Sequence, residues 1–507
     1  KINTKYRKII TSIPPENSIP ILNDLKKFEP ESMSLELPVV WEKAENFQIF
    51  DKNGNCWIDF SSGTFVVNVG HRHPKICKAI TETVDNNFLH NYYFPSEIRA
   101  KLVKKLHSMI PKNLDKVFLL TTGAEATECS IKLARIHGKK INENKIGIIS
   151  FLGAMHGKTL GALMVGGKTK EKHWIGNHDP DMYHLPFPSK DSGEEFFKES
   201  IKKLEESGVD LSTITAFMVE SYQGWGALFY PKNYIKALRK WANENNVIVI
   251  FDEIQAGFGR TGKLFAYEHY EIEADIVCCG KGISSGLPLS AVIGRKELVD
   301  VDPSLNSTHG GNPVCCAATL ASLEVLESEN LINESARKGE ILEKELMLIK
   351  EQYPERIEIF GKGLIFAVHI KNPATDALDA ELVDRIIEKN MMRRSYKDRM
   401  EAVAKKLGSD AFILSTTSTE KGVEIEATND PTELKKFSEK PKKRFSNLMT
   451  KELGNVAKFP LPKPTHKPVS ATSNYNGTTF KRRESNLLNQ DSELSVLSKN
   501  IRELTDK

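Results

Sequence analysis

Short apolar runs alternate with stretches of helical periodicity over most of the chain. The runs lie at residues 116–123, 145–153, 214–221, 247–253 and 274–282. Between them, segments such as residues 125–140 place apolar side chains three or four positions apart, the spacing of one helix face. Strands that alternate with helices predict an α/β fold, a mostly parallel sheet with helices on both faces. Residues 312–350 are expected to form long helices, and residues 356–370 a hairpin in a second, smaller domain.

The run at residues 247–251, VIVIF, leads directly into two adjacent carboxylates, Asp252 and Glu253. A strand that ends in acids often does no more than emerge into solvent. Here the run is continuous and β-branched, which is typical of a parallel strand covered on both faces. In open α/β sheets, ligands bind at the carboxyl ends of such strands. We therefore expect Asp252 to be a site residue.

The character of the chain changes past about residue 390. Residues 391–430 keep a small α/β pattern, with a helix expected at 400–408 and strands at 411–417 and 422–428. Residues 431–507 contain sixteen Lys and Arg against eight Asp and Glu, with many Pro, Ser and Asn. This composition buries too little apolar surface to fold, so a mostly disordered basic linker or tail is predicted. Its last part, residues 484–504, has amphipathic helical spacing.

Composition and charge exclude several classes of protein. A formal net charge of +4 over 507 residues gives no reason to expect nucleic acid or a membrane surface as a partner. No run approaches the ~18 apolar residues that span a bilayer. The seven cysteines include two adjacent pairs and no CxxC spacing. They are expected to be reduced, buried side chains of a cytoplasmic protein, with no metal site.

A lysine is the second group with candidate chemistry. Lys281 follows an apolar run and lies between two glycines. Most single lysines are ordinary surface residues, but one removed from water is a better nucleophile. Together with Asp252 it predicts a pyridoxal phosphate site, because that cofactor needs a lysine for its aldehyde and an acid for its ring nitrogen. Backbone N–H groups at Gly123 and Ala124, and the hydroxyl of Thr308, are candidate phosphate donors.

Six segments of the chain, in order and in approximate spacing, resemble the class III pyridoxal-phosphate aminotransferases. They read TTGAEATECSIKLAR, AMHGKTLGAL, ESYQGWGA, FDEIQAGFGRTGKLFAYEH, GKGISSGLPLSAVIG and THGGNPVCCAA, and residues 54–74 also match. The resemblance covers about residues 20–390. It implies a fold-type-I transferase that works as a homodimer with shared active sites. It also implies a large cofactor-binding domain at about 50–300, and a small domain from 1–49 and 301–390.

The resemblance also implies roles for individual residues. Lys281 would bind the cofactor and then move the proton at the substrate carbon. Asp252 would pair with the ring nitrogen and Gln255 with the ring hydroxyl. Gly123 and Ala124 would hold the phosphate, joined by Thr308 of the other subunit. Glu253 has no direct role by resemblance and is expected to support its neighbours.

Two positions depart from the family pattern within the site. Met155 stands where the family has a Phe or Tyr over the cofactor ring, and a thioether can still cover that face. Both Met155 and the following His156 are expected to bind the cofactor. Trp225 replaces the second glutamate of the motif EPxQGEG, which in many members pairs with a substrate-binding arginine. Glu220 and Gln223 of that motif remain. Glu220, Gln223 and Trp225 are expected near the substrate.

The resemblance stops at about residue 390, before the family's arginine that binds a substrate carboxylate. Residues 391–430 instead resemble the N-terminal region of the flagellar signal-recognition-type GTPase, without a P-loop. We interpret residues 1–390 as an aminotransferase domain with a truncated small domain, joined to foreign sequence by a fusion or a frame error. Apolar surface at residues 363–370 should then be uncovered.

Three functions remain open on these residues. The first is a transaminase that moves an amino group from an amino acid or an ω-amino acid, similar to 4-aminobutyrate, to a 2-oxo acid. The second is an aminomutase or racemase of the same family. The third is an inactive fusion chain whose tail is an interaction module.

Overall fold

The computed structural model describes residues 2–33, 37–92, 94–391, 412–419 and 422–428. These residues form two compact units. The larger holds residues 2–10 and 39–384, and the smaller holds the described parts of 11–38 and 385–428. The smaller unit contains helix α1 (Ile19–Phe28) and the hairpin of β17 (Phe412–Thr419) and β18 (Gly422–Thr428), which confirms the two strands expected there. The helix expected at 400–408 and the tail at 431–507 lie outside the described residues.

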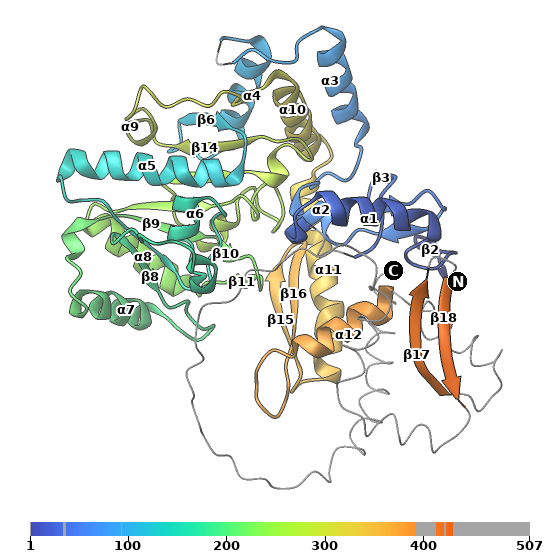
Figure 1. The fold of residues 1–507 in the computed structure, drawn as a ribbon. Coiled ribbons are helices and arrows are strands. Elements are labelled where there is room, and N and C mark those ends of the chain that lie inside the picture. The colour runs from blue at the N-terminus through green and yellow to red at the C-terminus, as the bar shows by residue number, and fades with distance from the viewer. Residues whose placement is uncertain (1, 34–36, 93, 392–411, 420–421, 429–507) are drawn as a thin grey trace, which may run out of the picture. The chain divides into compact units, whose positions relative to one another are not determined.

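A seven-stranded sheet forms the centre of the larger unit (Figure 1). The strand order is β6-β14-β13-β12-β9-β7-β8. Strand β14 runs antiparallel to both neighbours, and the other paired strands run parallel. The predicted mostly parallel sheet is therefore confirmed. Its strands are β6 (Lys116–Leu120), β7 (Gly147–Phe151), β8 (Met182–Leu185), β9 (Ile214–Glu220), β12 (Ile248–Asp252), β13 (Ile276–Cys279) and β14 (Ser290–Gly294).

Strand β12 shows why this sheet needs helices on both faces. All five of its residues are buried. Ile248 and Ile250 belong to an apolar cluster shared with helix α5 (Gly123–Ile141). Val249 and Phe251 belong to a second cluster shared with helices α7 (Glu194–Glu206) and α8 (Lys232–Glu244). Successive side chains of a strand point to opposite faces, so a continuous apolar run requires two covered faces.

The helices of the larger unit begin and end where the sequence provides local signals. Helix α5 starts with a capping box, in which the Thr122 side chain accepts from Glu125 N–H and Glu125 accepts from the backbone of Thr122. Lys139 and Lys140 lie in its last turn, where cations favour the helix dipole. The helices of the larger unit are α2 (Ser62–Phe65), α3 (Pro74–Asp85), α4 (Glu97–Met109), α5 (Gly123–Ile141), α6 (Leu160–Val165), α7 (Glu194–Glu206), α8 (Lys232–Glu244), α9 (Lys296–Val299), α10 (Pro313–Ser328), α11 (Leu331–Gln352) and α12 (Ala380–Met391). The last of these, α12, continues into the smaller unit.

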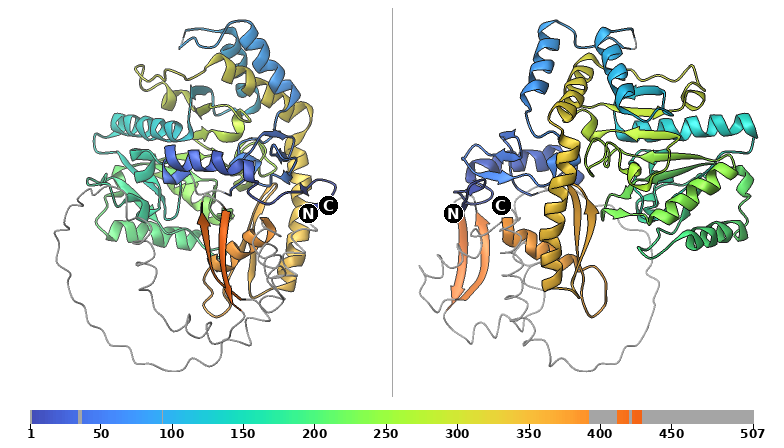
Figure 2. Two further views of the ribbon diagram at one scale, coloured as in Figure 1. Left: turned by 45° about the vertical axis from the view of Figure 1, so that its right-hand side comes forward. Right: turned by 180° about the vertical axis from the view of Figure 1, so that it is seen from behind.

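Smaller sheets complete the larger unit. The hairpin of β15 (Ile357–Lys362) and β16 (Ile365–Ile370) packs beside α11, as the views in Figure 2 show. The long helices and the hairpin predicted for 312–370 are thus confirmed. On the hairpin, Leu364 and Val368 are exposed and Ile365 and Ile370 are buried. The remaining strands are β1 (Ile2–Asn3), β2 (Lys8–Ile9), β3 (Lys43–Glu45), β4 (Gln48–Phe50) and β5 (Cys56–Ile58) in one antiparallel sheet, and β10 (Tyr222–Gln223) and β11 (Leu228–Phe229) in a short hairpin.

Two further observations concern the cysteines and the helices. All seven cysteines are free thiols, and all but the partly buried Cys77 are buried. Among the helices of the described residues, none is both long enough and apolar enough to cross a membrane.

Candidate active site

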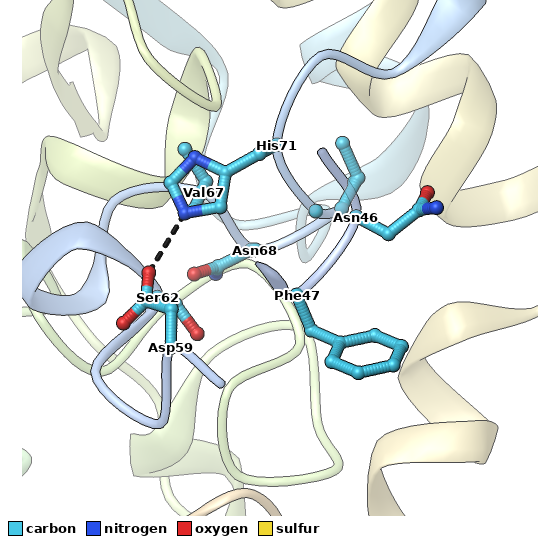
Figure 3. A pocket seen from close by; sticks show the side chains of 9 residues that line it. Asn46, Phe47, Asp59, Ser62, Val67, Asn68 and His71 are labelled. Carbon is cyan, nitrogen blue, oxygen red and sulfur yellow. Dashed lines mark hydrogen bonds and ion pairs between the residues drawn. The ribbon is translucent and has the colours of Figure 1, made fainter. Parts of the chain in front are cut away.

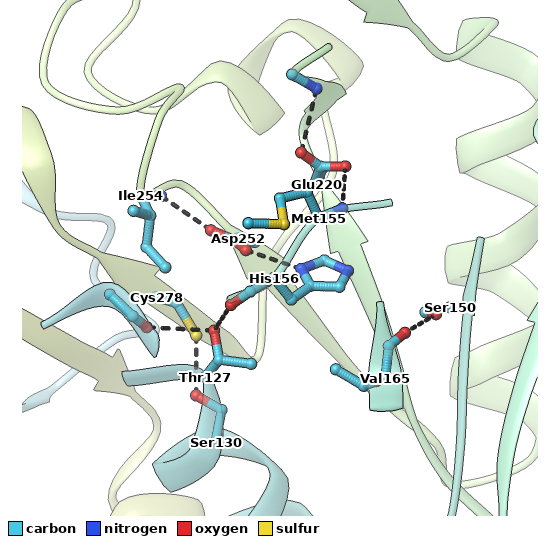
Figure 4. A network of polar contacts seen from close by, with 12 residues as sticks. Thr127, Ser130, Ser150, Met155, His156, Val165, Glu220, Asp252, Ile254 and Cys278 are labelled. Carbon is cyan, nitrogen blue, oxygen red and sulfur yellow. Dashed lines mark hydrogen bonds and ion pairs between the residues drawn. The ribbon is translucent and has the colours of Figure 1, made fainter. Parts of the chain in front are cut away.

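Asp252 lies at the carboxyl end of β12, and a histidine from a distant loop binds it. One carboxylate oxygen, Oδ2, lies 2.8 Å from Nδ1 of His156, and Oδ1 accepts from the backbone N–H of Ile254 at 3.0 Å (Figure 4). Both side chains are buried. Two partners on opposite oxygens fix the orientation of the carboxylate and leave it lone pairs for a further donor.

Lys281 begins a short 3-10 turn directly after β13. Its backbone has a φ of 41°, in the left-handed region that residues with a side chain seldom adopt. Such strain occurs where the surrounding structure holds a functional residue in one place. Lys281 is half-buried, and no hydrogen bond or ion pair joins its amine to another described residue. The amine is thus available to a ligand.

Three glycines bring the neighbourhoods of Asp252, Lys281 and the start of α5 into direct contact. A Cβ atom on Gly123 would lie 2.9 Å from Cγ2 of Ile254, and one on Gly280 would lie 3.1 Å from the same atom. A Cβ atom on Gly157, the residue after His156, would lie 3.0 Å from Cβ of Ala124. Only residues without side chains allow this approach. The first turn of α5, with its free N–H groups, therefore lies beside both candidate catalytic residues.

Glu220 links the loop of Met155 to the turn that carries Trp225. Its two carboxylate oxygens accept from the backbone N–H of Met155 at 3.0 Å and of Gly224 at 3.1 Å. Glu220 is paired with Asp252 in the register of β9 and β12. Burial raises the pKa of Glu220 from 4.5 to about 7, and the charge of Asp252 adds to this effect while His156 opposes it. Glu220 is therefore an acid that changes its charge near neutral pH.

Glu253, the second acid of the opening pair, points away from Asp252 into a different set of bonds. Its carboxylate accepts from the Ser221 hydroxyl and from the backbone N–H groups of Ala266 and Tyr267. Burial raises its pKa to about 8, although these three bonds oppose the rise. The contacts agree with the supporting role expected for Glu253, because they fix the loop that follows β12.

The other expected site residues lie around this centre. Gln255 has a buried side-chain oxygen, Oε1, without a partner among the described residues, and this oxygen would lie 2.6 Å from a Cβ atom on Gly224. Gln223 is buried and donates to the carbonyl of Leu152 at 2.7 Å. Thr308 lies exposed on a loop next to Ser307, whose hydroxyl donates to Glu125 of the α5 capping box at 2.7 Å.

Sequence reasoning missed Asn68, which lies beside the residue that follows Lys281. Its Nδ2 donates to the carbonyl of Phe258 at 3.0 Å, and a Cβ atom on Gly282, the residue after Lys281, would lie 2.3 Å from the same nitrogen. Asn68 lines a cavity of about 260 Å³ beside an ion pair of His71 and Asp59 at 2.7 Å (Figure 3). The segment 54–74 resembles the family, but no spacing in it marks Asn68.

Sequence reasoning also missed the pairing of His156 with Asp252. The two residues are 96 positions apart, and nothing in the local pattern around either one points to the other.

The fold and site together define a class of enzyme. A mostly parallel sheet carries a fixed carboxylate, a free lysine and an open helix N-terminus at one edge, which are the groups that pyridoxal phosphate requires. The family model of aminotransferase class-III matches residues 31–407. The chain belongs to this family, and it is a transaminase that uses pyridoxal 5'-phosphate. The match extends beyond residue 390, where we expect the foreign sequence to begin.

Individual relatives agree with the family. The acetylornithine aminotransferase of Methanocaldococcus jannaschii is 33% identical over 71% of this chain and 87% of its own length. The alanine/serine racemase of Pyrococcus horikoshii is 32% identical over 72% of this chain and 80% of its own. Among solved structures, a thermostable (S)-enantioselective omega-transaminase from Thermomicrobium roseum is similar at a TM-score of 0.68. It is 29% identical, over 74% of this chain and 90% of that one.

The residues present fit pyridoxal phosphate. The unpartnered oxygen of Gln255 and the unpartnered Nε2 of His156 are buried polar atoms close to Asp252. Buried polar atoms normally have partners, so these atoms indicate a place where a polar ligand completes the bonding. The side chain of Ile254 packs directly against Gly123 and Gly280, so the α5 terminus reaches the loop after β12 only because both positions lack side chains.

Proposed function

We propose that this transaminase moves an amino group from an amino acid or an ω-amino acid to a 2-oxo acid, with Lys281 and Asp252 as its catalytic residues. The observation that supports this most is the meeting of Gly123, Ile254 and Gly280, which brings the phosphate donors, the acid and the lysine to one edge of the sheet. When bound, the cofactor supplies an aldehyde that carries the amino group and a ring that accepts electrons from the substrate carbon.

Each of the site residues would then have a separate role in cofactor binding or proton transfer. Lys281 would bind the aldehyde carbon and later move the proton at the substrate carbon. Asp252 would hold a proton on the ring nitrogen, and His156 would keep Asp252 oriented for it. Met155 would cover the ring and Gln255 would bond the ring hydroxyl. Gly123 and Ala124 would bind the phosphate through the helix N-terminus.

The remaining expectations belong to this proposal. The enzyme would work as a cytoplasmic homodimer, with Thr308 of one subunit completing the phosphate site of the other. The exposure of Thr308 agrees with this arrangement. We keep residues 391–430 as a region that resembles the flagellar GTPase, although residues 391–407 also lie within the family match. Of that region, the structure describes little more than the β17–β18 hairpin.

Borohydride reduction tests the role of Lys281. Reduction of the holoenzyme followed by peptide mapping should place the pyridoxyl group on Lys281, and Lys281→Ala should lose the visible absorbance of the bound cofactor. Lys263, a nearby lysine outside the site, provides the control variant Lys263→Ala, which should keep that absorbance. A label found on another lysine would show that the assignment is wrong.

Racemisation is a second candidate activity of the same site, because the racemase from Pyrococcus horikoshii is about as similar to this chain as the acetylornithine aminotransferase of Methanocaldococcus jannaschii is. A coupled assay with 2-oxoglutarate measures amino-group transfer, and chiral chromatography of alanine measures racemisation. Transfer without racemisation would exclude the second activity. Racemisation without a 2-oxo acid would support it.

A further inference from the structure

The turn between β10 and β11 places an aromatic side chain beside the candidate cofactor site. The indole of Trp225 stacks on the imidazole of His369, with ring centroids 5.6 Å apart and planes at 20°. Phe360 packs against the same imidazole at 4.8 Å. The indole N–H donates to Oε1 of Gln223 at 3.1 Å, and Gln223 is itself held by Leu152. Trp225 is therefore fixed on one face and along one edge.

Its position relative to the site follows from two contacts. Glu220 joins the backbone of Met155 to that of Gly224, the residue before Trp225. A Cβ atom on Gly153 would lie 3.4 Å from the indole nitrogen. Because Met155 is expected to cover the cofactor ring, the indole lies next to the loop that borders the bound substrate.

The indole also has free surface. Trp225 is 52% exposed, although His369 covers one face of it. Burial lowers the pKa of His369, so the imidazole is neutral at neutral pH. A neutral aromatic pair gains free energy by burying apolar surface and gives a carboxylate no ionic partner.

We propose that Trp225 and His369 form an uncharged aromatic wall of the amino-donor site, which selects donors whose remote end is apolar over donors that end in a carboxylate. This inference rests on the proposed function and names its substrate class. 2-Aminohexanoate and 2-aminohexanedioate are a suitable pair of amino-acid donors, because they differ only in a remote methyl or carboxylate group.

The test compares kcat/KM for both donors in the full-length holoenzyme with pyruvate as acceptor, because pyruvate has no remote carboxylate. The wild type should prefer 2-aminohexanoate. Trp225→Ala should lower kcat/KM for 2-aminohexanoate at least about tenfold, equivalent to the loss of one buried apolar group, and change that for 2-aminohexanedioate less than about threefold. Trp225→Phe should keep most of the preference. Trp174, which is 58% exposed, gives the control Trp174→Ala with no change in the ratio.

A binding measurement separates the hypothesis of the aromatic wall from the hypothesis of transaminase function. 2-Phenylethanol has no amine to react, and ligand-observed NMR should show weaker binding to Trp225→Ala than to wild type. If neither these two amino acids nor 4-aminobutyrate transfers its amine, the proposed function fails, while the alcohol still tests the wall. If both donors react but Trp225→Ala alters neither their ratio nor the binding of the alcohol, the wall is wrong and the transaminase stands.

Discussion

Asp252 shows how a single residue gains a role from its two bonds. A carboxylate at the end of a buried strand would be costly without partners. Here Ile254 N–H and the His156 ring each take one oxygen, so the group is oriented as well as satisfied. The neighbouring Glu253 is also buried, but its bonds fix a loop. Adjacent acids thus have different tasks because their side chains point in different directions.

Asp252→Asn should retain the cofactor and lose at least about a hundredfold in kcat, because an amide does not hold the ring proton while the phosphate contacts persist. Cofactor absorbance and single-turnover kinetics measure the two effects. Glu253→Gln is the matched control, which should lower thermal stability but leave the turnover of the folded enzyme near normal. Normal turnover in Asp252→Asn would contradict the role given to Asp252.

Glu220 should make stability depend on pH. Its pKa is 4.5 in the ordinary state and about 7 in the folded chain. A carboxyl group whose pKa is raised in the folded state does not lower the free energy of unfolding below pH 4.5, because it is then protonated in both states. Between pH 4.5 and about pH 7 it lowers the free energy of unfolding more and more, and above about pH 7 it lowers it by a constant amount. The full cost is on the order of 3 kcal/mol.

Glu220→Gln removes this cost. Denaturant unfolding of wild type and variant should show the variant gaining relative stability as the pH rises from 5 to 8. The amide accepts only one of the two backbone bonds, which adds a loss that does not vary with pH. Parallel pH profiles for the two proteins would show that Glu220 keeps its ordinary pKa.

At the scale of elements, the site depends on how closely α5 approaches the loop after β12. The capping box fixes the start of helix α5 at Thr122. Gly123, the first residue of the helix, then faces Ile254 without a side chain between them. The same helix packs its apolar face on the sheet through Ala126, Cys129 and Leu133. Packing of the helix body therefore determines where its N-terminus, the candidate phosphate site, lies.

Gly123→Ala should weaken cofactor binding about tenfold, because the new Cβ would overpack against Ile254, a kind of contact that costs roughly 1–3 kcal/mol. Titration of the cofactor-free protein with pyridoxal phosphate, followed by absorbance, gives the affinity. Ile254→Ala in the same chain removes the opposing atoms and should restore most of the binding. Without restoration, the loss has another cause than this contact.

At the scale of the whole molecule, the two ends of the chain differ in composition. The apolar periodicity that predicts the larger unit is absent from residues 431–480, where Lys, Pro and Ser predominate. Leu364 and Val368 on the β15–β16 hairpin are exposed, and we propose that a truncated small domain leaves them uncovered. Such surface favours association between molecules.

Limited proteolysis tests this organisation. Protease should cut first between about residues 431 and 480, and the remaining core should still bind the cofactor. Mass spectrometry locates the cuts, and absorbance reports the cofactor. If that region resists protease and its deletion unfolds the core, the tail is part of the fold and the fusion interpretation fails.

The sequence alone determined the type and order of the main elements, because periodicity depends on near neighbours in the chain. It also indicated Asp252 and Lys281, since strand ends and flanking glycines are local features. Only the tertiary structure decided which of these residues meet. The contacts of His156 with Asp252, of Gly123 with Ile254 and of Trp225 with His369 depend on strand order and on the packing of helices and hairpins. Strand order and packing are not encoded in any short stretch of sequence, because they result from the burial of all apolar faces together.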